Sequence, residues 1–426
     1  MGRRFISSVV PFLERHPRLK ALARRVQFLV WHLMVRIRTL RYRAVLPDPD
    51  KMYWINPQRI EYALIIDELN RNDKYRLLGG VIRGNWDLKR TRFSEAGLGL
   101  FHGLEDRFVR RLPWVETEFY KRVLDMICGG THLWGCRNKS EWDERCRHLD
   151  SLYHAIEAGG YRAQQEIETR HISFWKAEDE ITIRIGRDGA LLFEDGQHRL
   201  AMAKLLKIDE IPVRITARHT EWYRFRKEVL DYARSQPSGK LYHPITHPDL
   251  ADIPALYGNE RFEIIKSHMP VLGGDLLDIG AHWGYFCHKF EEQGFNCYAV
   301  ESHAPTRYFL EKLKVAENRR FKIIYGSIFD YDDKTDFDVV LALNIFHHFI
   351  KTERYYHCLV ALLKRLRMKV MFFQTELPDS PQMIGAYRNF NCNEFVEFIL
   401  ENSVLKEAMH IGETENGRPI YRLQIS

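Results

Sequence analysis

The chain has 426 residues, of which 45% are hydrophobic and 13% aromatic, so it is not a disordered protein and is long enough for two or three domains. Its net charge of +7 is unevenly distributed, because residues 1–45 hold eleven Lys/Arg and one acidic residue while the remainder is slightly acidic. This excludes a nucleic-acid-binding surface over the whole protein, and we expect no sequence-specific nucleic-acid partner.

Cysteine usage and hydropathy predict a cytoplasmic protein. The seven cysteines are odd in number and form no C-x-x-C pair, which favours a reducing compartment. The longest apolar run near the N-terminus, Val26 to Val35, is about half as long as a bilayer span requires.

Residues 1–46 are predicted to form a basic amphipathic helical segment. Its apolar residues recur at helical spacing and are Val26, Leu29, Leu33, Ile37 and Leu40. Three interpretations remain open: a helix packed on the protein body, an interfacial helix on anionic lipid that would place the protein peripherally at a membrane, and a nucleic-acid-binding arm.

Residues 47–230 are predicted to form an α+β domain with a first strand over 52–60 and a helical insertion at about 61–148. The insertion contains a cluster of possible metal ligands, Cys128, His132, Cys136, Cys146 and His148. Their spacing lacks the C-x2–4-C pair of structural zinc sites, so we interpret them as core cysteines with surface or helix histidines and predict no metal site.

The strongest pattern of this domain covers 149–216. A strand at 181–185, a turn at 186–189 and a strand at 191–193 lead into Glu-Asp-Gly-Gln-His-Arg, which opens a helix from about Gln197. The stretch Ile208 to Ile215, with a closing Ile-Pro-Val strand, follows. The N-terminus of a helix binds anions through free backbone N–H groups, and an arginine there adds a bidentate phosphate ligand.

This segment resembles the ParB/sulfiredoxin-like superfamily, whose members hold nucleotide phosphates in such a turn. The resemblance implies a phosphate-binding turn formed by Asp195, Gly196, His198 and Arg199, with ATP or CTP and Mg as candidate ligands. The alternative is a scaffold that has lost its ligand. No ParB-type DNA-binding helices follow.

Residues 231–258 contain four prolines and few periodic apolar residues, which predicts an inter-domain linker. His243 and His247 are expected to lie exposed in it as ordinary polar loop residues.

Residues 259–426 alternate between helix and strand, which predicts a doubly wound, mainly parallel sheet. We expect helices at 260–269, 284–293, 305–317, 351–366 and 393–402, and strands at 275–279, 296–300, 321–325, 337–343 and 369–374. A hairpin turn at Glu415-Asn-Gly-Arg418 predicts that a final pair of strands is antiparallel.

The first strand of this domain runs into Asp278-Ile-Gly280-Ala-His282-Trp-Gly284, and the next strand ends in Glu301. Glycines let the backbone approach a ligand, and an acidic residue at the tip of the neighbouring strand is placed for ribose hydroxyls. A nucleoside cofactor is expected. The spacing does not supply the G-x-G-x-x-G that a nicotinamide cofactor requires.

These motifs and the terminal hairpin resemble the class I S-adenosylmethionine-dependent methyltransferases, over about 258–426. The resemblance implies a Rossmann-like seven-stranded sheet and S-adenosylmethionine as cofactor. The implied cofactor-binding residues are Asp278, Gly280, His282, Gly284, Glu301, Ser327, Ile328 and Asn344. The family commonly has an Asp in place of Ser327, for the adenine amine, and a central glycine in place of His282. A histidine is tolerated there if its φ is negative; the alternative is a reshaped methionine pocket.

His347 and His348, after the fourth strand, are candidate general bases for a hydroxyl acceptor, or walls of the substrate cleft. The lack of an Asn/Asp-Pro-Pro-Tyr/Phe motif disfavours methylation of DNA bases, and Cys287 and Cys297 are interpreted as buried residues.

We therefore expect a methyltransferase acting on a small-molecule or glycan-type acceptor, in a bifunctional chain with a nucleotide-binding ParB-like domain. The alternatives are a nucleotide-dependent phosphotransferase or switch with an inactive or sensing methyltransferase fold, and a membrane-associated scaffold.

Overall fold

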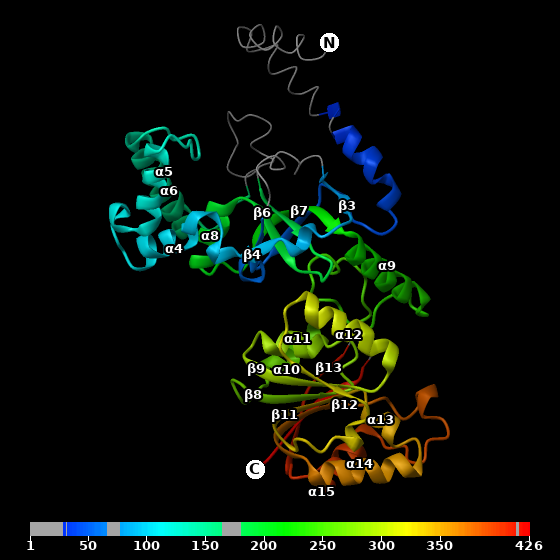
Figure 1. Cartoon of the computed structure of the whole chain (residues 1–426). Helices are drawn as coiled ribbons and strands as arrows, with labels where there is room; N and C mark the ends of the chain where they lie inside the picture. Colours follow the sequence, from blue (N-terminus) through cyan, green and yellow to red (C-terminus); the bar gives the residue numbers. More distant parts are fainter. Residues whose placement is uncertain (1–28, 31, 66–76, 164–179, 415–416) are drawn as a thin grey trace. The chain divides into compact units, whose positions relative to one another are not determined.

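The computed structural model describes residues 29–30, 32–65, 77–163, 180–414 and 417–426. The chain divides into two compact units, Met1–Val229 and Leu230–Ser426 (Figure 1). The boundary falls inside helix α9 (Thr220–Ser235), which therefore continues past the predicted start of the linker.

The first unit is built on a mixed seven-stranded sheet in the order β1-β7-β5-β6-β2-β4, with β3 paired to β7. Its strands are β1 Met52–Ile55, β2 Tyr62–Leu64, β3 Gly80–Ile82, β4 Arg90–Arg92, β5 Ile181–Ile185, β6 Leu191–Asp195 and β7 Ile211–His219. Its other α-helices are α4 Leu100–Leu104, α5 Glu118–Cys128, α6 Lys139–Gly159 and α8 Gln197–Leu205.

The predicted strand–turn–strand–helix–strand pattern of this unit is confirmed as β5, β6, α8 and β7. β6 pairs with β5 in antiparallel orientation and β7 pairs with it in parallel, so β5 lies between them. All nine residues of β7 are buried, as expected for a strand covered on both faces.

Two expectations for this unit were wrong. The first strand stops at Ile55 instead of running to residue 60, because Asn56 caps a 3-10 helix (Pro57–Arg59) by accepting the N–H of Gln58 at 2.8 Å, and Pro57 has no N–H to pair. The insertion is not wholly helical, since β2, β3 and β4 all join the sheet.

The predicted N-terminal helical segment lies partly outside the described residues; residues 29–30 and 32–39 are helical and lead into a 3-10 turn, Leu40–Tyr42. Among the described residues, every helix is too short or too polar to cross a lipid bilayer.

The second unit contains the predicted doubly wound sheet, in the order β10-β9-β8-β11-β12-β14-β13. Its strands are β8 Gly274–Ile279, β9 Phe295–Glu301, β10 Lys322–Tyr325, β11 Asp336–Leu343, β12 Arg367–Gln374, β13 Glu407–Glu413 and β14 Pro419–Gln424. Its helices are α10 Glu260–Ser267, α11 Tyr285–Glu291, α12 Ala304–Ala316, α13 Phe346–Phe349, α14 Glu353–Arg365 and α15 Cys392–Asn402.

The pairing in this sheet is parallel from β10 to β12, and β14 is antiparallel to both of its neighbours. This confirms the predicted mainly parallel sheet closed by a terminal hairpin. Part of the predicted turn, residues 415–416, lies outside the described residues; Thr414 donates its N–H to the carbonyl of Arg418 across it.

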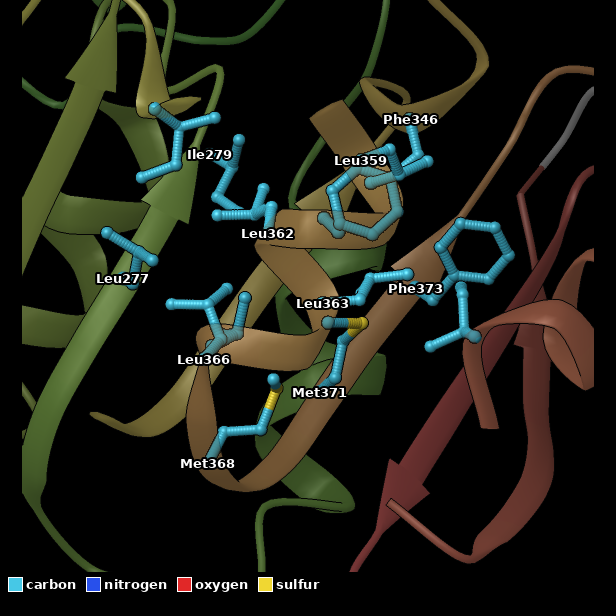
Figure 2. Packing of buried hydrophobic residues seen from close by; sticks show 14 of the residues in the cluster. Leu277, Ile279, Phe346, Leu359, Leu362, Leu363, Leu366, Met368, Met371 and Phe373 are labelled. Carbon is cyan, nitrogen blue, oxygen red and sulfur yellow. The ribbon is translucent and has the colours of Figure 1, made fainter. Parts of the chain in front are cut away.

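Side chains of the parallel strands alternate between two apolar cores. Leu277 and Ile279 of β8 pack with Leu362 and Met371 on the α14 side of the sheet (Figure 2), whereas Leu276 belongs to the core on the side of α10 and α11. Because helices cover both faces, the polar ends of the strands are where a ligand can be reached.

The segment 231–258 is not an exposed linker. His247 and Leu250 are fully buried, the Thr246 hydroxyl donates to Glu317 at 2.6 Å, and the ring of His243 stacks on Tyr285 with centroids 4.9 Å apart. The expectation that His243 and His247 are exposed was wrong, because this polar, proline-rich stretch satisfies its groups against the second unit.

Candidate functional site

The turn after β8 is bent by residues in the left-handed conformation. Gly280 has φ 78° and Gly284 has φ 80°. A Cβ on Gly280 would lie 2.9 Å from Cδ1 of Ile345, and one on Gly284 would lie 2.6 Å from Cδ1 of Leu310. Both positions therefore require glycine for conformation and for space.

His282, between these glycines, has φ 53°, so the condition of a negative φ is not met. Its backbone N–H donates to Oε2 of Glu301 at 2.9 Å, a charge-assisted bond that offsets the cost of the left-handed backbone. Burial lowers the pKa of its imidazole to about 4. The family's central glycine is therefore replaced without loss of the left-handed turn.

Glu301, the last residue of β9, faces this turn as predicted. Its Oε2 accepts the N–H of His282 and its Oε1 accepts the N–H of His303 at 2.8 Å. Burial raises the pKa of its carboxyl, and these backbone hydrogen bonds oppose the shift. Ser302 also donates its backbone N–H to this carboxylate. The two oxygens have four acceptor positions in all, so these three backbone donors leave one for a ligand hydroxyl.

Aromatic side chains line the turn. Trp283 is 5% exposed and stacks on Phe309 of α12 at 4.2 Å. Tyr232 packs against both rings, with centroids 4.9 and 5.4 Å away. Burial, and then the charge of Glu301, raise the pKa of Tyr232. These rings pack on one another and give the carboxylate an apolar surrounding.

Asp278 is buried at the end of β8, with 3% of its surface exposed. The Cys287 thiol donates to it at 3.8 Å, and burial, assisted by the charge of Glu301, raises its pKa to about 7. Cys287 and Cys297 are both buried, as predicted.

The predicted adenine residues follow β10. The Ser327 hydroxyl accepts the N–H of Phe329 and caps a 3-10 helix, Ile328–Asp330. The side chain of Ile328 lies in the apolar core, and its carbonyl accepts Arg365 at 2.7 Å. These contacts position the loop; an adenine contact there stays a prediction.

A polar cluster lies where β11 and β12 end. Asn344 (φ 55°) donates its backbone N–H to Gln374 at 2.9 Å and its side-chain amide to the Tyr242 hydroxyl at 3.0 Å. Gln374 donates to the carbonyl of Arg418 at 3.0 Å, and Arg418 donates to Glu376 at 2.7 Å. Segment 231–258, β12 and the terminal hairpin thus meet at one edge of the sheet.

Several polar atoms of this cluster are buried and have no hydrogen-bond partner within the described part of the chain: Asn344 Oδ1, Gln374 Oε1, and both ring nitrogens of His347. Burial, with the nearby charges of His348, Lys351 and Arg418, lowers the pKa of His347 to about 3. The pKa of His348 is lowered by burial and by Lys351, whose ammonium lies 3.4 Å from its Nδ1. Unpaired buried acceptors are costly, so this edge favours a ligand that donates hydrogen bonds.

The predicted phosphate-binding turn in the first unit is formed by the end of β6 and the start of α8. Gly196 has φ 95°, and a Cβ there would lie 2.9 Å from Cγ1 of Ile181. Arg199 lies 3.5 Å from Glu180, whose side chain is fully buried. The ring of His198 lies beside that of Trp134, with centroids 5.4 Å apart, and burial lowers the pKa of His198 to about 4. Asp195 remains exposed.

The Cys/His cluster of the insertion is split between core and surface. Cys136 and Cys146 are buried, as expected for core residues, whereas Cys128 is exposed at the end of α5. Burial raises the pKa of the Cys146 thiol to about 12, so this thiol stays protonated and packs as an apolar group.

Sequence reasoning missed Tyr232, Tyr242, Gln374, Glu376 and Arg418. The strand ends at Gln374 and the hairpin at Arg418 could have drawn attention to two of them. No sequence pattern pointed to Tyr232 or Tyr242, since both lie in the stretch 231–258 that was predicted to be a linker.

Residues 277–366 match the family model described as a methyltransferase domain. The comparison with curated proteins gave no match.

Among solved structures, the chain is similar to monomeric WbdD, with 19% identity and a TM-score of 0.38 over 46% of this chain and 48% of that chain. A medium-resolution structure of the bifunctional kinase-methyltransferase WbdD gives 19% identity and a TM-score of 0.37 over 46% and 45%. The methyltransferase domain of bacterial CtHen1 is 11% identical, with a TM-score of 0.32 over 39% of this chain and 98% of that chain. The chain spans about half the length of the WbdD chains, and these TM-scores are too low to carry an argument.

The family match covers the segment from β8 to the end of α14, which contains the glycine turn, Glu301 and the polar cluster. The strand order is the one expected for a class I methyltransferase, including the antiparallel terminal hairpin. The chain therefore contains a methyltransferase domain in its C-terminal unit.

Proposed function

We propose that the C-terminal unit transfers a methyl group from S-adenosylmethionine to a hydroxyl group of a small-molecule or glycan-type acceptor. The observation that carries the proposal is the pairing of the Glu301 carboxylate with the glycine turn, at 2.9 Å from the His282 N–H. This pairing puts a carboxylate that can accept hydrogen bonds from ribose hydroxyls beside the glycine turn.

The residues of this edge fit the cofactor. Glu301 would accept the ribose hydroxyls, Gly280 and Gly284 allow the left-handed turn that holds the backbone beside Glu301, and the unpaired Oδ1 of Asn344 would accept a donor such as the cofactor's ammonium. S-adenosylmethionine supplies an electrophilic methyl group when bound. What the protein adds is position, because methyl transfer is an in-line displacement.

The polar cluster supports the proposed class of acceptor. Gln374 Oε1 and the His347 nitrogens are unpaired within the described residues, so they favour an acceptor whose hydroxyls donate hydrogen bonds. His347 is neutral at physiological pH, because its pKa is lowered to about 3, and one of its nitrogens can accept the hydroxyl hydrogen bond. An apolar acceptor would leave these groups unsatisfied.

Calorimetric titration with S-adenosylmethionine tests the first half of the proposal. Binding to the wild type, weakened in Glu301→Ala, is the expected result; the absence of any heat, or equal affinity in the variant, overturns it. Methyl release from labelled cofactor, screened over polyhydroxylated acceptors, tests the second half. His347→Phe is expected to lower kcat while leaving cofactor affinity unchanged.

A second candidate function belongs to the first unit, where the left-handed Gly196 opens α8 against Ile181. Such a turn before a helix N-terminus suits a nucleotide phosphate. The function would be nucleotide binding or phosphoryl transfer, with Asp195, His198 and Arg199 at the phosphates. Binding of ATP or CTP with Mg²⁺ that is lost in Arg199→Ala and kept in Glu301→Ala would support it. No binding of either nucleotide to the wild type would remove it.

A further inference from the structure

The N-terminal helix of the described chain presents apolar side chains to solvent. Figure 1 draws this helix in blue. Leu29, Val30, Leu33, Met34, Ile37 and Leu40, together called the outer stripe, are exposed by 66, 49, 60, 56, 59 and 58%. Isolated exposed apolar residues are ordinary, but six within twelve positions form a continuous patch.

The outer stripe is one face of a helix whose other face is anchored. Val35 is 2% exposed, Arg38 donates to the carbonyl of Leu78 at 2.6 Å, and Arg36 pairs with Asp48 and Asp50. At 100° per residue, the stripe lies opposite Val35. The exposure is therefore built into the orientation of a docked helix.

Basic side chains border the outer stripe. Arg36 lies on the helix at the edge of the stripe, Arg41 lies in the 3-10 turn that follows it and Arg43 comes directly after that turn; all three are exposed. The sequence around them is strongly basic, with eleven Lys/Arg against one acidic residue in positions 1–45. An apolar face bordered by cations is the pattern of a helix that lies in the plane of a membrane surface.

We propose that the outer stripe docks on the surface of a bilayer that contains anionic lipid. Leucine, isoleucine and methionine side chains would enter the boundary between headgroups and acyl chains, while the arginines would contact phosphates. A second copy of the chain is a poorer occupant, because two such segments bring together charges of the same sign. A nucleic acid would use the arginines but leave the apolar side chains in water.

The test uses the full chain and vesicles of phosphatidylcholine, with and without phosphatidylglycerol. Sedimentation with the vesicles is expected only when phosphatidylglycerol is present, and to weaken as salt rises. The double variant Leu33→Asp/Ile37→Asp is expected to lose at least about tenfold in binding, since a charge replaces each inserted side chain. The matched control is Leu272→Asp/Ile384→Asp, which changes two apolar residues that are 99% and 83% exposed elsewhere.

Circular dichroism and thermal unfolding verify that both double variants remain folded. The proposal is overturned if the wild type ignores vesicles with phosphatidylglycerol, or if the stripe variant binds them as well as the control does. It is also overturned if light scattering shows a wild-type dimer that the stripe variant dissociates, because the stripe then joins two copies. Binding to duplex DNA that survives in the stripe variant, without vesicle binding, would assign the arginines to nucleic acid instead.

Discussion

The backbone N–H of His282 lies 2.9 Å from Oε2 of Glu301, so the turn after β8 is held by the carboxylate that ends β9. One side chain thus shapes the turn and faces the proposed ribose position. The methyltransferase proposal depends on this arrangement.

Replacing this carboxylate with an amide separates charge from shape. Glu301→Gln keeps one oxygen acceptor but loses the charge, so affinity for S-adenosylmethionine is expected to fall about ten- to a hundredfold, the value of a charge-assisted hydrogen bond. Isothermal titration calorimetry measures it. The control is Glu311→Gln on the exposed surface of α12. Equal affinities in the two variants would contradict the assignment of Glu301.

The glycine turn offers a comparison at nearly matched backbone angles. Gly280→Ala forces a Cβ to within 2.9 Å of Ile345 at φ 78°, whereas Gly294→Ala places a Cβ in open space at φ 90°. Both variants pay for the left-handed backbone, roughly 1 kcal/mol. Only Gly280→Ala also displaces Ile345, so it is expected to lose more stability in urea denaturation and to lose cofactor affinity. A Gly294→Ala variant that is equally impaired would show that φ alone matters.

The packing of segment 231–258 predicts where the C-terminal unit can be cut. A fragment of residues 230–426 is expected to unfold cooperatively, whereas residues 259–426 lose the buried side chains of Leu241, Ile245, His247, Leu250 and Ile253. Each fully buried aliphatic side chain contributes about 1.5–3 kcal/mol, so the shorter fragment should be strongly destabilised. Chemical denaturation of both fragments measures this. Similar stability in the two would mean that the segment is a linker after all.

Asp278 predicts a specific dependence of stability on pH. Its pKa is raised from 3.8 to about 7, so between these values the folded protein holds a proton that the unfolded chain has lost. The free energy of unfolding therefore falls as pH rises through this window. Asp278→Asn removes the effect. From pH 4 to 7, the free energy of unfolding of the variant should therefore rise relative to that of the wild type, by on the order of a few kcal/mol.

The control for this experiment is Asp338→Asn. Lys369 and the N–H of Asp275 lower the pKa of Asp338, so this carboxyl titrates below the pH range of the experiment. The difference in the free energy of unfolding between Asp338→Asn and the wild type should therefore stay constant from pH 5 to 8. A flat difference for Asp278→Asn as well would show that the Asp278 carboxyl is ionised in the folded protein.

Except for the short helix α13, the β-strands and α-helices of the C-terminal unit were predicted to within a few residues, because buried parallel strands and amphipathic helices have different apolar periods. The first unit was harder. β2, β3 and β4 are three residues long and pair with distant strands, so their sequences carry too little periodicity to be distinguished from loops. At the candidate site, the spacing of the glycines and Glu301 predicted that the turn and the carboxylate lie together, as the structure shows. The left-handed φ of His282 had no local signal, since it depends on a hydrogen bond to a residue nineteen positions away.

The sequence by itself determined the doubly wound sheet, its terminal hairpin and the identity of the turn and carboxylate, because these follow from local periodicity and from short motifs. The tertiary structure decided that segment 231–258 packs on the second unit, that Tyr242 reaches Asn344, and that Gln374, Glu376 and Arg418 join one polar edge. It also decided that the outer stripe faces solvent. Contacts between residues far apart in the chain depend on how the elements pack, and no local pattern of amino acids encodes them.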